Sequence, residues 1–86
     1  MYESVYNADD QAVKRANPKK LFGQRIRDLR AERGLNQEEL AEKVGVFRTY
    51  MSRIETGVAN PTLTMIYALA DALGVDVVAL FELDHG

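Results

Sequence analysis

Cysteine and tryptophan are both absent from the 86-residue sequence. Without a thiol the chain can form neither a disulfide framework nor a thiolate metal site. Its single histidine, His85, stands one residue from the C-terminal end, where we expect a frayed tail and no metal ligand. No apolar run approaches the roughly 18 residues that cross a bilayer, and the N-terminus has no signal-like apolar segment. We therefore expect a cytoplasmic protein without a membrane partner.

The residues of a catalytic centre are missing as well. There is no cysteine nucleophile, no histidine inside the domain and no glycine-rich phosphate loop. Each pair of carboxylates has a structural explanation, so none is left for acid–base chemistry. We expect no enzymatic activity, no catalytic residue and no cofactor. The length fits one domain with a modest core.

Basic residues are absent after Arg53. All 11 Lys and Arg lie in residues 1–53, where eight acidic residues leave a formal charge of +3, whereas residues 54–86 carry five acidic residues and a charge of −5. The net charge of −2 therefore belongs to a polarised molecule, one end of which can meet phosphate while the other stays acidic. The basic excess is small, so tight binding to nucleic acid would need two copies.

Apolar residues recur at helical spacing throughout, and no segment has the alternation of a strand. Asn17 and Pro18 predict the start of a helix that runs to about Arg33, and Gly34 follows as its stop. Residues 1–17 have no sustained apolar period and are predicted to be an arm, flexible or marginally helical over residues 8–16. A second interpretation is that basic residues of this region touch the DNA backbone or minor groove; they are Lys14, Arg15, Lys19 and Lys20.

The segment Gln37–Thr56 predicts two short helices joined by a tight turn. Asn36 and Glu39 form an N-cap and capping box for the first of them, and Gly45 ends it. The second helix buries Met51 and Ile54 and offers hydroxyl and guanidinium groups on its other side. Such a helix, supported by its neighbour, suits the DNA major groove.

Two more helices complete an all-α prediction of five short helices. Thr62 caps a helix with apolar residues at spacings of three and four, namely Leu63, Ile66, Leu69, Ala70 and Leu73. Asp76 is predicted to cap a final helix from Val77 to about Leu83. Leu80 and Phe81 would close the core, which leaves apolar side chains for a subunit contact.

The motifs of this chain follow a known order: RIRDLRAERGLNQEELAEKVGV, TYMSRIETG, NPTL, ALADALGV and LFE. From about Leu21 to Glu82 the sequence resembles the helix-turn-helix domain of the phage repressor and Cro family, including the bacterial xenobiotic-response-element regulators. The segment TYMSRIETG also resembles the controller proteins of restriction–modification systems. The resemblance implies a five-helix DNA-binding domain over residues 18–86 with its helix-turn-helix motif at residues 37–56.

The resemblance also implies residue roles. Gln37 matches a glutamine that meets a phosphate and supports the recognition side chains. Arg30 and Glu55 match a structural ion pair and are therefore not expected to contact DNA or to act in catalysis. The remaining DNA-binding candidates are base-recognition residues Arg48, Thr49 and Arg53, the flanking Tyr50 and Ser52, and Arg27 as a phosphate contact.

Phe47 departs from the family pattern, which has Ser or Thr capping the recognition helix at this position. Phenylalanine cannot accept hydrogen bonds from the first backbone amides, a loss of about 0.5–2 kcal/mol. Three explanations stay open: the amides meet water or a DNA phosphate, Phe47 packs beside Tyr50, or Phe47 contacts a thymine methyl group.

The resulting hypothesis is a sequence-specific regulator that binds double-stranded DNA through the major groove. A homodimer would bind a pseudo-palindromic operator, with its subunit contact at Val75, Val77, Val78 and Phe81. A rival hypothesis is an antitoxin of the same fold that binds a toxin, and RNA polymerase is another possible protein partner. Operator sequence, and repression as against activation, stay open at this point.

Overall fold

Four α-helices and one short 3-10 helix form the part of the chain that the computed structural model describes, residues 17–82. They are α2 (Pro18–Glu32), α3 (Gln37–Val44), α4 (Arg48–Glu55), α5 (Leu63–Leu73) and the 3-10 helix η2 (Val77–Phe81). No strand occurs among residues 17–82, so the all-α prediction is confirmed. None of the helices in this range is long and apolar enough to span a bilayer. The arm was predicted at residues 1–17, and its residues 1–16 lie outside the described residues, as does the tail around His85.

The caps that the sequence predicts are present at the starts of α2 and α3. The side chain of Asn17 accepts hydrogen bonds from the amides of Lys19 and Lys20. Asn36 and Glu39 form both halves of the capping box, at 2.7 and 2.8 Å. Gly45 ends α3 with a φ of +79°, a left-handed conformation that glycine adopts without steric cost.

The C-terminal element differs from the prediction. It is a 3-10 helix that ends at Phe81, not an α-helix that reaches Leu83, and Asp76 makes no side-chain capping bond. Because a 3-10 helix has three residues per turn, residues three apart share one edge. Val77 and Leu80 accordingly face the core, while Val78 and Phe81 are exposed.

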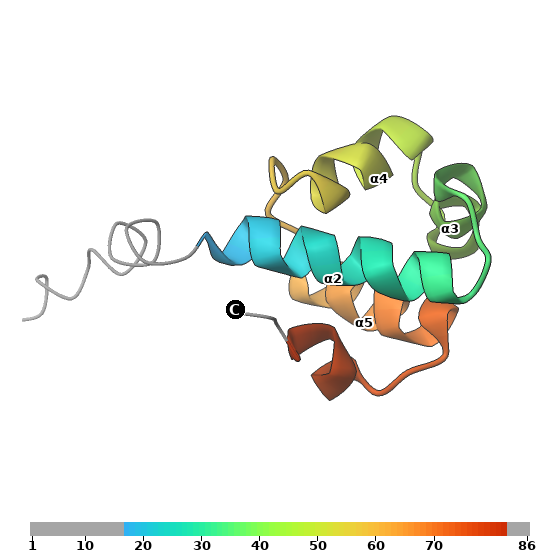
Figure 1. The fold of residues 1–86 in the computed structure, drawn as a ribbon. Helices are drawn as coiled ribbons and strands as arrows, with labels where there is room; N and C mark the ends of the chain where they lie inside the picture. The colour runs from blue at the N-terminus through green and yellow to red at the C-terminus, as the bar shows by residue number, and fades with distance from the viewer. Residues whose placement is uncertain (1–16, 83–86) are drawn as a thin grey trace, which may run out of the picture.

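Helix α2 lies between the other elements. Figure 1 shows α4 on one side of α2 and η2 on the opposite side, with α5 behind; α2 contacts all three. Helix α3 packs against α4 and α5. The largest fully buried side chains come from all five elements and form one core: Ile26, Leu40, Met51, Ile54, Leu69 and Leu80.

Gly23 is the point of closest approach between α2 and α4. A β-carbon at this position would lie 2.6 Å from the carbonyl oxygen of Glu55, and nearer still to that of Ile54. A side chain of any size would therefore push the two helices apart. The contact fixes the C-terminal end of α4 against the first half of α2.

Candidate functional site

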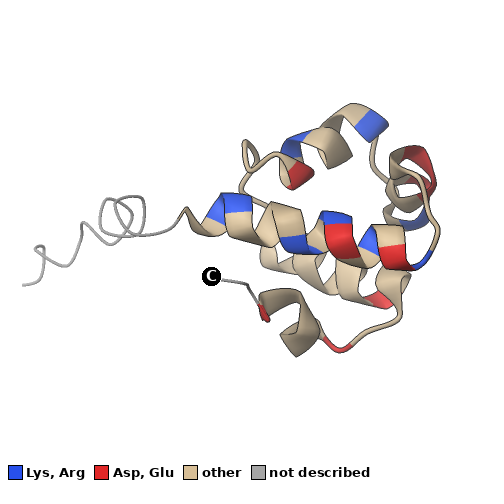
Figure 2. Ribbon diagram, viewed as in Figure 1, with Lys and Arg blue, Asp and Glu red and all other residues tan. Residues whose placement is uncertain are grey.

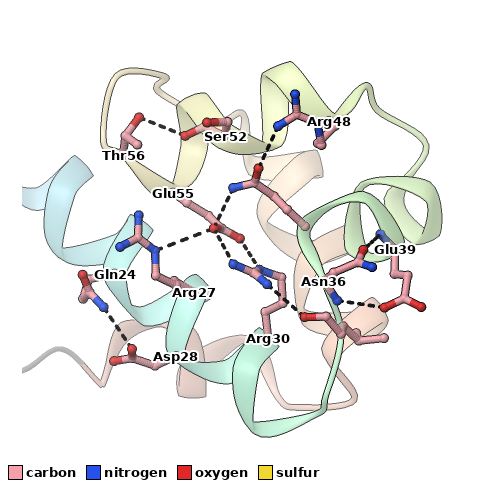
Figure 3. Close-up of polar contacts among 12 residues, drawn as sticks. Gln24, Arg27, Asp28, Arg30, Asn36, Glu39, Arg48, Ser52, Glu55 and Thr56 are labelled. Carbon is pink, nitrogen blue, oxygen red and sulfur yellow. Dashed lines mark hydrogen bonds and ion pairs between the residues drawn. The ribbon is translucent and has the colours of Figure 1, made fainter.

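The carboxylate of Glu55 lies at the junction of α2, α3 and α4. Its side chain has no exposed surface. Arg30 donates to both carboxylate oxygens, from Nε at 2.7 Å and from Nη2 at 3.0 Å, and the Nε of Arg27 lies 3.8 Å away. Figure 3 shows both arginines extending from α2 toward Glu55 on α4. A buried charge is costly unless it is paired and hydrogen-bonded, and Glu55 is both.

Arg30 also connects the turn after α2 to this cluster. Its Nη1 donates to the carbonyl oxygen of Leu35 at 2.9 Å. The hydrogen bond that Arg30 donates to Glu55 raises the pKa of the guanidinium above its ordinary value, and this outweighs the lowering effect of burial. The contact with Glu55 therefore favours the charged form of Arg30.

Gln37 extends the cluster from Glu55 to the exposed side of α4. Its Nε2 donates to Glu55 at 3.0 Å, and its Oε1 accepts from Nη1 of Arg48 at 3.3 Å. An ionised carboxylate only accepts hydrogen bonds, so the amide nitrogen of Gln37 must face Glu55 and its oxygen must face Arg48. The buried carboxylate thus sets the orientation of the side chain that holds Arg48.

The predicted base-recognition residues lie on the outer side of α4. Arg48, Thr49 and Arg53 are exposed, and Ser52 is half-buried beside them. Tyr50 differs from these residues because it packs partly against the core. The helix therefore presents two guanidinium groups and two hydroxyl groups on one surface.

Phe47 lies at the N-cap of α4 with 83% of its surface exposed. It makes no side-chain capping bond. This exposure contradicts the explanation that Phe47 packs beside Tyr50. A phenyl ring and the uncapped first amides of α4 are therefore presented at the start of the candidate recognition helix.

Two other arginines have structural contacts that the sequence did not reveal. Arg25 donates from Nε to the carbonyl oxygen of Ala79 at 2.9 Å and pairs with Glu82 at 3.3 Å. Arg33 donates to the carbonyl oxygen of Leu73. Apart from Glu82, the acceptors are backbone carbonyl groups far along the chain, which leave no signal in the pattern of side chains. Arg25 and Arg33 therefore hold η2 and the end of α5.

The remaining basic residues of the described range are unevenly distributed. Figure 2 shows Lys and Arg on α4 and along α2, whereas η2 carries none. Four basic side chains have no hydrogen bond or ion pair to any residue within 17–82: Lys19, Lys20, Lys43 and Arg53. Three of these four lie on α4 or the first turn of α2.

Exposed apolar side chains gather on α5 and η2, which pack against each other. Val78 is 68% exposed, and Phe81 is half exposed while its ring lies 5.4 Å from that of Phe22. Val75 and Val77, also predicted at the subunit contact, are partly buried against the core. Two further exposed apolar residues of α5 were not predicted from the sequence, because Leu63 was assigned to the buried stripe and Tyr67 to no surface. Leu63 is 70% exposed and Tyr67 54%.

No group of three potential metal ligands comes together within residues 17–82. The polar groups that do come together are guanidinium and amide donors around one buried carboxylate, and hydroxyl groups lie on the outer side of α4. Donors of this kind bind phosphate oxygens and base edges.

Comparison with known proteins matches this chain to a domain family and to a phage repressor. Residues 21–83 match a family model described as a helix-turn-helix domain. The chain is 47% identical over 58 residues to the immunity repressor of Bacillus phage phi105, a match that covers 67% of this chain and 40% of that repressor. The chain therefore spans less than half of that relative.

Solved structures with the same fold include two regulators. The restriction–modification controller protein C.AhdI of Aeromonas hydrophila superposes with a TM-score of 0.71 and 44% identity, over 72% of this chain and 94% of that one. The biofilm regulator SinR, solved in complex with DNA, gives a TM-score of 0.66 and 39% identity, over 71% and 98% of the two chains.

We predict that replacing Arg30 by Ala destabilises the fold by about 3–5 kcal/mol, because it leaves the buried Glu55 carboxylate without its main partner. Urea unfolding followed by circular dichroism measures the loss. Arg53→Ala is the matched control, since that arginine is exposed, and it should change stability by less than about 0.5 kcal/mol. Equal stabilities of the two variants would contradict the structural role of Arg30.

Proposed function

The chain belongs to the helix-turn-helix family of transcriptional regulators, and we propose that it is a sequence-specific regulator that binds double-stranded DNA as a homodimer. Each subunit would insert α4 into the major groove of one half of a pseudo-palindromic operator. The observation that carries this proposal is the chain of contacts from Glu55 through Gln37 to Arg48. It holds an exposed guanidinium in place on the outer side of a short, firmly packed helix.

Arg48 and Arg53 are proposed to contact base edges. A guanidinium can donate two parallel hydrogen bonds to O6 and N7 of guanine, which discriminates against other bases by about 1–3 kcal/mol. The two residues lie five positions apart on α4, with Thr49 exposed between them. With an arginine near each end, the exposed side of α4 can contact several neighbouring base pairs.

Gln37 and Arg27 are proposed to contact phosphates and so to support the base contacts of Arg48 and Arg53. Gln37 begins α3, and its oxygen already accepts from Arg48. Arg27 keeps 45% of its side chain exposed although it lies near Glu55, and Arg30 already supplies the two close hydrogen bonds to that carboxylate. The guanidinium of Arg27 can therefore still donate to a phosphate oxygen.

Phe47, Tyr50 and Ser52 are proposed to make the flanking contacts. The exposed ring of Phe47 lies at the start of α4, where an apolar group can meet the methyl group of thymine. The uncapped amides beside it can donate to a phosphate. Tyr50 packs partly against the core, so its contact would involve only the outer part of its ring.

A homodimer is proposed because one copy of α4 recognises too few base pairs. Twofold symmetry would place two copies about 34–36 Å apart, one turn of DNA. The candidate contact surface consists of the exposed apolar residues of α5 and η2 with the two flanking valines: Leu63, Tyr67, Val75, Val77, Val78 and Phe81. Figure 1 shows η2 on the side of α2 opposite α4, so two subunits could join at η2 while both α4 helices face DNA.

Replacing Arg48 by Ala is expected to relax base preference at one position in each half-site and to weaken binding to the preferred operator about tenfold or more per subunit. Competition binding between that operator and its single-base variants measures the effect. Lys43→Ala is the matched control: Lys43 lines a shallow groove between α3 and α5 with Ala68 and Asp71, away from α4. If Arg48→Ala weakened binding equally to every sequence, Arg48 would be a phosphate contact.

Replacing Val78 by Glu is expected to shift the protein toward monomer, because the substitution places a charge in an apolar contact surface. Sedimentation equilibrium without DNA measures the change. Val58→Glu is the control, since Val58 is similarly exposed but lies in the loop after α4. A dimer of unchanged stability in the Val78 variant would remove η2 from the subunit contact.

A further inference from the structure

We infer that Lys20 forms a second phosphate contact on α2, in line with Arg27 along the edge of α2 beside α4. We call this pair of residues the α2 basic edge. The inference rests on the proposed DNA-binding function and adds a residue to it. The contact would lie beyond the C-terminal end of α4 and would be independent of the bases that α4 recognises.

Four residues of α2 share the face that meets α4. Lys20, Gly23, Arg27 and Arg30 follow at positions i, i+3, i+7 and i+10, the spacing of one helical face. Contacts in the structure place each of them against α4 or the residues that follow it. Gly23 meets the carbonyl groups of Ile54 and Glu55, and both arginines approach Glu55.

Lys20 continues this face past the end of α4. Gly57 has a φ of +81°, and a β-carbon there would lie 2.8 Å from the Cα of Lys20 and closer to its Cγ. The backbone and the aliphatic stem of Lys20 therefore lie directly against Gly57. The residue is nevertheless exposed, so the packed stem leaves the ammonium group at the surface.

Lys20 differs in its contacts from the basic residues that stabilise the fold. Arg25, Arg30 and Arg33 each donate to a named acceptor in the protein. Lys20 makes no side-chain hydrogen bond or ion pair with any residue in the range 17–82. Its position against Gly57 is set by packing alone, and its charge remains available to a ligand.

The loop after α4 explains why this position matters. Residues 56–62 contain no basic residue, so DNA backbone beside this loop would find its cations only on neighbouring elements. Seven residues of helix separate Lys20 from Arg27, about 10 Å along the axis. Two cations this far apart on the α2 basic edge can each meet a different phosphate of the same strand at the border of the groove.

Salt dependence of DNA binding tests the inference. Each neutralised phosphate contributes about 0.9 to the slope of log Kobs against log[salt], so Lys20→Gln should lower the magnitude of the slope by about 1.8 in a homodimer. Between 50 and 200 mM salt, the variant would lose roughly tenfold less affinity than the wild-type protein. Base preference should not change, and Lys20→Arg should keep the wild-type slope.

Lys43→Gln is the matched control, because it removes the same charge from the groove between α3 and α5. A smaller slope in Lys20→Gln alone supports a direct phosphate contact. Equal slopes in the two variants would overturn it, since only the overall charge would then matter. Thermal unfolding of each variant verifies that the fold is intact.

Two further measurements separate this inference from the proposed function. Ethylation of single phosphates on the operator should reveal one position in each half-site that interferes with wild-type binding and not with Lys20→Gln binding. The absence of such a position would contradict the contact. The second measurement is the base preference of the wild-type protein. If the protein bound all sequences equally, the proposal of sequence-specific regulation would be wrong, while the slope difference would still decide whether Lys20 meets a phosphate.

Discussion

One buried charge, the carboxylate of Glu55, organises the packing of the helices around it. It would be costly in the core without partners, and it receives two hydrogen bonds from Arg30, one from Gln37 and a longer ion pair with Arg27. The same bonds join α2, α3 and α4. Because Gln37 must turn its amide nitrogen toward Glu55, its oxygen is left for Arg48. Fold stability and the position of a proposed base contact thus depend on one side chain.

Helix α2 connects the two surfaces that the proposed function needs. One face holds α4 through Gly23 and Arg30, and another holds η2 through Phe22 and Arg25. The angle between the recognition helix and the candidate subunit contact is therefore set within one helix of 15 residues. A twofold dimer must place its two α4 helices one DNA turn apart, so rigidity of α2 matters for operator spacing as well as for stability.

Local chemistry explains what the sequence could predict. Caps and helix stops depend on residues within four positions of each other, so Asn17, Asn36 and Gly45 were assigned correctly. Contacts between distant segments were missed, as with Arg25 and Arg33, because their acceptors are backbone carbonyls. The 3-10 form of η2 and the exposure of Leu63 depend on how the chain end packs, which periodicity does not reveal. The sequence left three explanations open for Phe47, and its exposure excludes packing beside Tyr50.

Sequence-specific binding by a homodimer can be tested by selecting DNA from a random pool with the wild-type protein at a fixed salt concentration. We expect an inverted repeat whose half-sites are centred about 10–10.5 base pairs apart, with a guanine at a fixed position in each half. Footprinting on the selected sequence should protect both halves together. Enrichment of no sequence, or of a single half-site without its inverted copy, would contradict a homodimer that recognises bases through α4.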